Sequence, residues 1–171
     1  LQAFVINTHV QGGDHQEDPY VETVTNGFTY MFGRLRTINI SNQTAGNPDT
    51  NGNGFGVEID ESRPIYQGGP VMDAIASTNT PGAFIYSGRS GVAGRYYVDV
   101  LRDMTDAFAW GQVDSGGAKG GWRYGWNSGA DNSACQWAAI GMIAAEDNFG
   151  IWVPPFVKTE NDDYWLQYSY N

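Results

Sequence analysis

The feature that most constrains the fold is an apolar stretch at residues 131–146, entered through a glycine- and aromatic-rich segment at residues 120–126. Ala, Ile, Met and Trp side chains fall on several sides of a helix drawn through this stretch, which leaves no wide polar face. Such a helix is stable only when other elements cover it. We therefore expect a buried helix here, with Asp131 as its N-terminal cap and Cys135 as a small buried hydrophobic residue.

Similar apolar segments recur along the chain. They occupy residues 1–8, 72–78 and 140–146, with a spacing of roughly 70 residues. Amphipathic helical patterns begin near Tyr20, Tyr97 and Phe156, where the apolar positions recur at helical spacing. The alternation of apolar and amphipathic segments predicts an all-α fold built from helical hairpins.

The glycine- and tryptophan-rich turn at residues 120–124 and the helix that follows resemble the repeat of squalene cyclases and protein prenyltransferase β subunits. The run Gln67-Gly68-Gly69, just before the second apolar segment, is similar to a second copy. The resemblance implies an α/α toroid. The predicted hairpins amount to about half of such a barrel, in a single domain at residues 1–171 with a loop insertion at residues 39–64.

The catalytic motifs of that family are absent from this sequence. The Asp-x-Asp-Asp acid of the cyclases has its nearest match at residues 160–163, which begin with Glu and are interpreted as a solvated acidic face. The zinc ligands of prenyltransferases would need a distant histidine beside Asp131 and Cys135. We therefore expect a non-catalytic module with a structural or adhesive role. The alternative is a fragment of a toroid enzyme, related to terpene cyclases, prenyltransferases or polysaccharide-processing enzymes.

One segment has the spacing of a calcium loop. Calcium loops place oxygen ligands at positions 1, 3, 5, 7 and 12, with glycine at position 6. Here the corresponding residues are Asp49, Asn51, Asn53, Phe55 and Asp60, with Gly54 at the sixth position. A cluster of Asn-Gly turns without any ion has the same appearance, so both interpretations stay open, and calcium is the expected cofactor.

Composition and charge limit the classes of molecule that this chain is expected to bind. The chain carries 19 acidic and 9 basic residues and a formal net charge of −10, which disfavours nucleic acids and anionic membranes because both are polyanions. No apolar run is long enough to span a membrane. Two glycosylation sequons begin at Asn39 and Asn42. With the high Gly, Asn and aromatic content, they favour an extracellular or cell-surface glycoprotein. The acidic charge is compatible with calcium, cationic surfaces or neutral ligands such as glycans.

Two groups of aromatic residues are candidates for binding. Trp122, Tyr124, Trp126 and Trp137 form either a ligand platform or packing between hairpins. Tyr164, Trp165, Tyr168 and Tyr170 lie near helical spacing at the C-terminus and are typical of an interface. We expect self-association, as an oligomer or filament, or docking to the missing half of the toroid, because unpaired apolar ends are rarely tolerated in a monomer.

Overall fold

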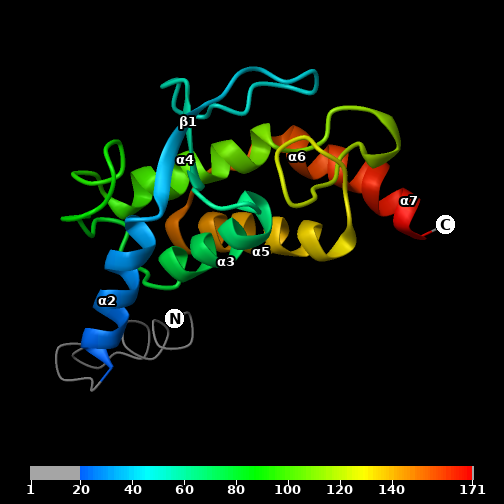
Figure 1. Cartoon of the computed structure of the whole chain (residues 1–171). Helices are drawn as coiled ribbons and strands as arrows, with labels where there is room; N and C mark the ends of the chain where they lie inside the picture. The colour runs from blue at the N-terminus through cyan, green and yellow to red at the C-terminus, as the bar shows by residue number, and fades with distance from the viewer. Residues whose placement is uncertain (1–19, 171) are drawn as a thin grey trace.

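The structure is a computed structural model that describes residues 20–170. Its first half contains helix α2 (Val21–Phe32), strands β1 (Leu35–Asn39) and β2 (Phe55–Ile59), and helix α3 (Pro64–Ala76). Its second half contains helix α4 (Tyr97–Trp110), the short η2 (Gly116–Ala118), helix α5 (Asn132–Phe149), and a C-terminal run of α6 (Pro155–Glu160), the π-helical η3 (Asn161–Leu166) and α7 (Gln167–Tyr170). Figure 1 shows α3, α4 and α5 grouped at the centre, with α2 projecting at one end.

The prediction of an all-α half-toroid is wrong. β1 and β2 pair antiparallel, with Leu35 opposite Ile59 and Asn39 opposite Phe55, so the fold combines helices with a two-stranded sheet. β2 lies inside the segment 39–64 that the sequence predicts to be a loop insertion. Each strand has only five residues, and a long loop joins them, so the Asn-Gly pairs at residues 51–54 do not form the two-residue turn of a tight hairpin.

The positions of the helices agree better with the sequence. The apolar segments 72–78 and 140–146 fall largely within α3 and α5, and the amphipathic patterns near Tyr20, Tyr97 and Phe156 coincide with α2, α4 and α6. The segment 1–8 lies outside the described residues. Asp131 caps α5 as predicted, because its side chain accepts a hydrogen bond from the Ala134 N–H at 2.8 Å.

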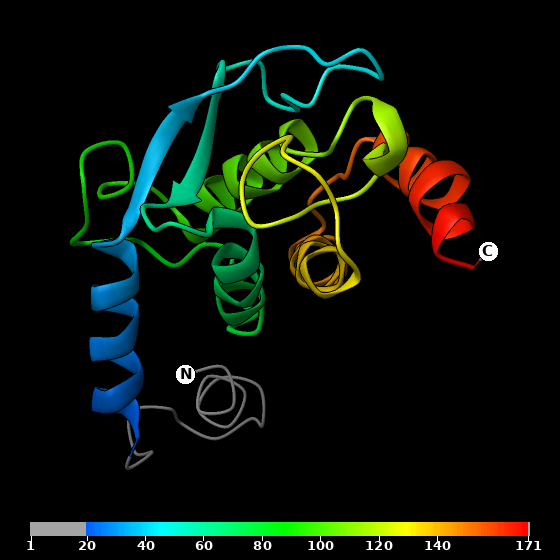
Figure 2. The same cartoon turned by 45° about the vertical axis from the view of Figure 1, so that its right-hand side comes forward.

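Glycines bring α3 and α5 close together. A Cβ atom added to Gly69 would lie 2.7 Å from the carbonyl carbon of Trp137, and one added to Gly141 would lie 3.1 Å from the Cα of Gly69. Neither position has room for a side chain. Figure 2 looks nearly along α5 and shows α3 and α4 beside it. The run Gln67-Gly68-Gly69 therefore serves a close helix contact.

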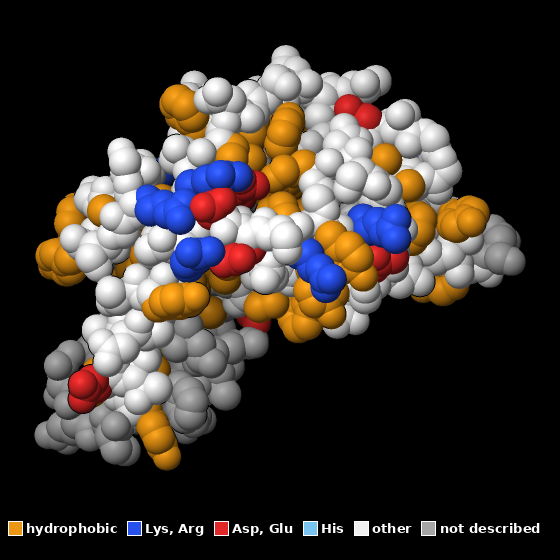
Figure 3. All heavy atoms as spheres, viewed as in Figure 1, with side chains coloured by type: hydrophobic (Ala, Val, Ile, Leu, Met, Phe, Trp, Pro, Cys, Tyr) orange, Lys and Arg blue, Asp and Glu red, His pale blue; other side chains and the backbone are white. Residues whose placement is uncertain are grey.

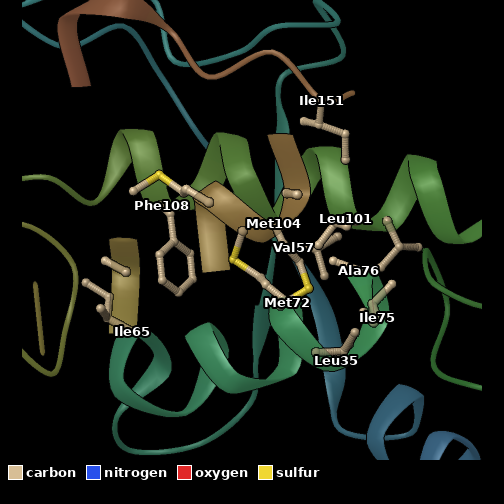
Figure 4. Close-up of a cluster of buried hydrophobic side chains, with 14 of the residues drawn as sticks. Leu35, Val57, Ile65, Met72, Ile75, Ala76, Leu101, Met104, Phe108 and Ile151 are labelled. Atoms are coloured by element: carbon tan, nitrogen blue, oxygen red, sulfur yellow. The ribbon is translucent and has the colours of Figure 1, made fainter. Parts of the chain in front are cut away.

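The sheet and the central helices share one hydrophobic core (Figure 4). Its fully buried side chains include Leu35 and Val57 from the sheet, Ile65, Met72 and Ile75 from α3, and Leu101, Met104 and Phe108 from α4. Each contributes about 1.5–3 kcal/mol by leaving water. The hairpin is thus packed into the fold and is not an appendage to a helical array.

Candidate functional site

The loop between β1 and β2 binds its own backbone with the oxygen atoms that the sequence assigns to calcium. The carboxylate of Asp49 accepts hydrogen bonds from the N–H groups of Gly52 and Gly54, at 2.7 and 2.8 Å. The side-chain oxygen of Asn51 accepts from Asn53 N–H, and that of Asn53 accepts from Phe55 N–H. These are the local turn bonds expected of Asn and Asp, so the loop has a defined conformation without an ion.

This loop is also anchored to α4 through two buried carboxyl groups. Asp103, with 1% of its surface exposed, accepts hydrogen bonds from the side-chain amides of Asn51 and Asn53 and pairs with Arg95 at 2.7 Å. Asp106 is fully buried and accepts from the N–H and hydroxyl of Thr50. The sequence analysis did not single out either carboxyl, because α4 is more than forty residues away in sequence from the loop.

Within residues 20–170, no cation pairs with Asp106 to offset its burial. The pKa of Asp106 is raised to about 7, chiefly by burial and also by the negative charges of Asp103 and Asp49, against the two hydrogen bonds from Thr50, which lower it. A carboxyl with this pKa exchanges its proton near neutrality. The contact between the loop and α4 therefore contains one group that titrates in the physiological range.

Asp60 lies apart from the other predicted calcium ligands. Phe55 begins β2 and Asp60 follows its end, a separation of about 17 Å for five residues of extended chain. Asp60 pairs with Arg36 at 2.9 Å and also with Arg89. A ring of ligands running from Asp49 to Asp60 is thus not formed, because a strand occupies the second half of the motif. Among the described residues, no three His, Cys, Asp or Glu side chains are grouped so that they could hold a metal ion.

Two of the four predicted platform residues are packing residues. Trp122 is 2% exposed, and its indole N–H donates to the carbonyl of Phe108 at 2.9 Å. Trp126 packs edge-on against Phe108 and donates to the buried carboxylate of Glu58. For these two residues the alternative of packing between elements is the one that the structure supports.

The other two meet a third aromatic residue at the surface. Tyr124 and Trp137 are both half-buried, and Tyr66 of α3 lies between them. The Tyr66 ring contacts the Tyr124 ring at 5.7 Å and the Trp137 ring at 6.1 Å, edge to face in both pairs. We call Tyr66, Tyr124 and Trp137 the aromatic platform. Tyr66 follows the N-terminus of α3 closely and so joins the platform from an element that the sequence analysis treated only as a repeat.

Local bonds hold the aromatic platform in place. Tyr124 is attached to α3 because its carbonyl accepts a hydrogen bond from the N–H of Ile65. Trp137 is held by the glycine contact between α3 and α5. Two arginines approach the Tyr124 ring: the guanidinium carbon of Arg63 lies 4.9 Å from its centre and that of Arg123 lies 5.8 Å from it. These are distances at which guanidinium groups are attracted to aromatic rings.

The remaining predicted sites lie elsewhere on the surface. Asn39 and Asn42 are exposed, at the end of β1 and in the loop after it, where a glycan could be attached; glycosylation stays a prediction. At the C-terminus, Tyr168 and Tyr170 are 67% and 86% exposed, whereas Trp165 is buried and donates to the side chain of Asn132. Tyr164 is partly exposed and lies against the ammonium group of Lys119.

The acidic residues and the cysteine that were considered for catalysis lie in environments that do not activate them. Asp162 and Asp163 are exposed on η3, as expected of a solvated acidic face. Burial raises the pKa of the Cys135 thiol to about 11, so the thiol stays protonated at neutral pH and lacks the thiolate that nucleophilic attack or metal binding requires. His9 and His15 lie outside the described residues.

Comparisons of the chain with models of protein families, with curated proteins and with solved structures found no match. None of the helices in residues 20–170 combines the length and the apolar character needed to cross a membrane. The candidate site is therefore argued from its own geometry, and the aromatic platform with its two arginines is the surface that offers most to a ligand.

Proposed function

We propose that this chain is a non-catalytic adhesive module of an extracellular or cell-surface protein, and that it binds glycans on the aromatic platform. The observation that carries the proposal is the convergence of Tyr66, Tyr124 and Trp137 from three separate segments into one partly exposed cluster. Aromatic side chains combine a large apolar surface with a polar group at the edge. A sugar ring has a matching character, with C–H groups on its faces and hydroxyls around its rim.

The platform is also rigid enough to bind without a large entropic cost. Its three side chains belong to α3, α5 and the segment that enters α5, and the close contact of Gly69 with Trp137 fixes the two helices relative to each other. A surface that is already ordered loses less conformational entropy on binding. Aromatic residues that serve only the core would be covered as Trp122 is, whereas these three keep part of their surface in water.

Adhesive function at a cell surface is consistent with two further features. The two sequons lie on exposed residues, at the end of β1 and in the loop that follows it. The net charge of −10 disfavours nucleic acids as an alternative ligand for an aromatic surface.

Binding to a glycan array, followed by calorimetry with the best oligosaccharide, tests the proposal. We expect Trp137→Ala and Tyr66→Ala each to weaken binding about tenfold, because a lost aromatic contact of about 1–1.5 kcal/mol corresponds to that factor. Tyr86→Ala is the matched control, since Tyr86 is 89% exposed and lies outside the aromatic platform. Circular dichroism of each variant checks the fold. An array without any bound glycan, or binding that survives both platform substitutions, would overturn the proposal.

A further inference from the structure

Arg63 differs from every other basic residue of the chain. All nine Lys and Arg residues fall within the described part of the sequence. Eight of them lie within 4.0 Å of a carboxylate oxygen: Arg34, Arg36, Arg89, Arg95, Arg102, Lys119, Arg123 and Lys158. Arg63 has no such partner among residues 20–170, although the chain holds 19 acidic residues. A positive charge left without an acid in such an acidic chain is available to an acid supplied from outside.

The position of Arg63 places that charge on the aromatic platform. Arg63 is exposed and immediately precedes α3, and its guanidinium lies over the ring of Tyr124. A guanidinium that stacks on a ring keeps the N–H donors at its edge free. The N-terminal end of α3 adds partial positive charge in the same place.

Arg123 brings a second, loosely held charge to the same ring. Its side chain is 57% exposed, and its Nε atom is 3.9 Å from the carboxylate of Asp131, a distance too long for a hydrogen bond. That carboxylate is already engaged by Ser133 and by the N–H of Ala134. Figure 3 shows Lys and Arg side chains beside hydrophobic side chains in the region where α3 and α5 begin.

We propose that Arg63, assisted by Arg123, binds a carboxylate on the glycan, so that the ligand of this surface is an oligosaccharide containing a uronic acid. The inference rests on the proposed function and deepens it. The planar fork of a guanidinium matches a carboxylate and can bind it through two parallel hydrogen bonds. The sugar ring that carries the carboxylate lies against the aromatic platform, and the carboxylate points to its edge.

The charge of the whole chain selects for a glycan with few acidic groups. A polysulfated or fully acidic polymer would be repelled by the net charge of −10, whereas one carboxylate in a short oligosaccharide meets only the local field of Arg63 and Arg123. We therefore expect the preference for an acidic sugar to be a local contact that weakens as salt is raised, since exposed charges are screened.

A matched pair of ligands tests the inference. The probes are a short, otherwise neutral oligosaccharide with a single galacturonic acid and the methyl ester of that acid, which keeps the sugar ring and removes the charge. We expect the acid to bind about tenfold more tightly than the ester, as one charge-assisted contact provides. Arg63→Gln should abolish most of that preference by weakening the binding of the acid more than that of the ester, and Arg63→Lys should restore part of it. Arg34→Gln, which removes an arginine paired with Glu61, is the matched control.

The outcomes separate the two proposals. Equal binding of acid and ester, or a preference that Arg63→Gln leaves intact, would overturn the carboxylate contact while the aromatic platform keeps its proposed function. Tighter binding of the same oligosaccharide with one sulfate in place of the carboxylate would overturn the choice of a carboxylate. Failure of both probes to bind, together with an array on which no glycan binds, would refute the proposed function itself.

Discussion

Replacing Asp106 with asparagine should stabilise the fold at neutral and alkaline pH and leave it nearly unchanged at acidic pH. The folded chain holds this carboxyl with a pKa of about 7, against an ordinary value of 3.8. Between those two pH values the folded chain keeps a proton that the unfolded chain has released. Stability from this group is therefore fully present below about pH 4, falls as the pH rises towards 7, and is lost above it.

Asparagine fits the position of the protonated acid. In the structure the two carboxyl oxygens accept from the N–H and the hydroxyl of Thr50. In the variant, the amide oxygen can accept from the N–H, and the amide nitrogen can donate to the Thr50 hydroxyl after that hydroxyl has rotated. The substitution removes a buried charge without leaving a buried polar group unpaired.

The expected gain in the free energy of unfolding follows from the pKa of Asp106. A shift from 3.8 to about 7, at 1.36 kcal/mol per unit, corresponds to about 4 kcal/mol. Adjustment of the loop around the charge reduces this value, so we expect Asp106→Asn to raise the free energy of unfolding by about 2–4 kcal/mol at pH 8.5 and by under about 0.5 kcal/mol at pH 4. Urea unfolding at several pH values, at constant ionic strength and with a chelator present, measures the difference.

The control for this series is Asp99→Asn. Asp99 lies on the same helix but is partly exposed and pairs with Arg102 at 3.5 Å, so its removal should change stability little and without the same pH dependence. A difference between the Asp106 variant and the native chain that stays constant from pH 4 to pH 8.5 would refute the reasoning. It would mean that Asp106 ionises normally in the folded chain.

Three further outcomes are expected. Gly69→Ala should destabilise the fold by about 2–4 kcal/mol, because a Cβ there meets the backbone of Trp137. The control Gly82→Ala, with no atom within 4 Å of the added carbon, should change stability by less than about 0.5 kcal/mol. Equal effects of the two substitutions in calorimetry would contradict the close contact. Calcium and a chelator should give the same unfolding midpoint, because the Asp49 carboxylate is engaged by the N–H groups of Gly52 and Gly54 and Asp60 is engaged by arginines; a rise with calcium that Asp49→Ala removes would restore the loop as a calcium site. Sedimentation at micromolar concentration should show self-association that Tyr168→Asp weakens, since Tyr168 is 67% exposed; a single monomeric species rules it out.

The helices could be predicted from sequence because their signals are local. In α4, Leu101, Met104 and Phe108 are buried at helical spacing, and such a pattern is visible within one window of sequence; the burial of Asp103 and Asp106 on the polar side is not. For α5 the sequence predicts the helix but overstates its burial, because only one face is covered and Ile143 is 54% exposed. These inferences needed no knowledge of what lies opposite each helix.

The sheet could not be predicted in this way because its pairing is not local. Leu35 is opposite Ile59, and a loop rich in Gly and Asn separates their strands. The strand at residues 55–59 also falls within the calcium-like motif. That motif predicts a loop for residues that form a strand in the structure. Gly56 needs its small size because an added Cβ would lie 2.7 Å from the side chain of Ala107 on α4, a contact that no local pattern reveals.

Only the part of the candidate site that is close in sequence could be predicted, because contacts between distant segments leave no local pattern. Tyr124 and Trp137 are close in sequence and could be proposed together, whereas Tyr66 and Arg63 come from α3 and join them only because α3 and α5 pack closely. The signal that could have found them is the pair Gly68-Gly69, since adjacent glycines inside a helix cost stability and so indicate a close approach.

That glycine contact ties the stability of the fold to its binding surface. A side chain at Gly69 would push against the backbone of Trp137, and any increase in the distance between α3 and α5 also separates Tyr66 from Trp137. The two rings now meet at 6.1 Å, and an edge-to-face contact weakens when its rings move beyond about 7 Å. A substitution that only loosens the helix pair should therefore reduce glycan affinity before it unfolds the chain. Binding measured on Gly69→Ala below its unfolding midpoint would reveal this link between core packing and surface recognition.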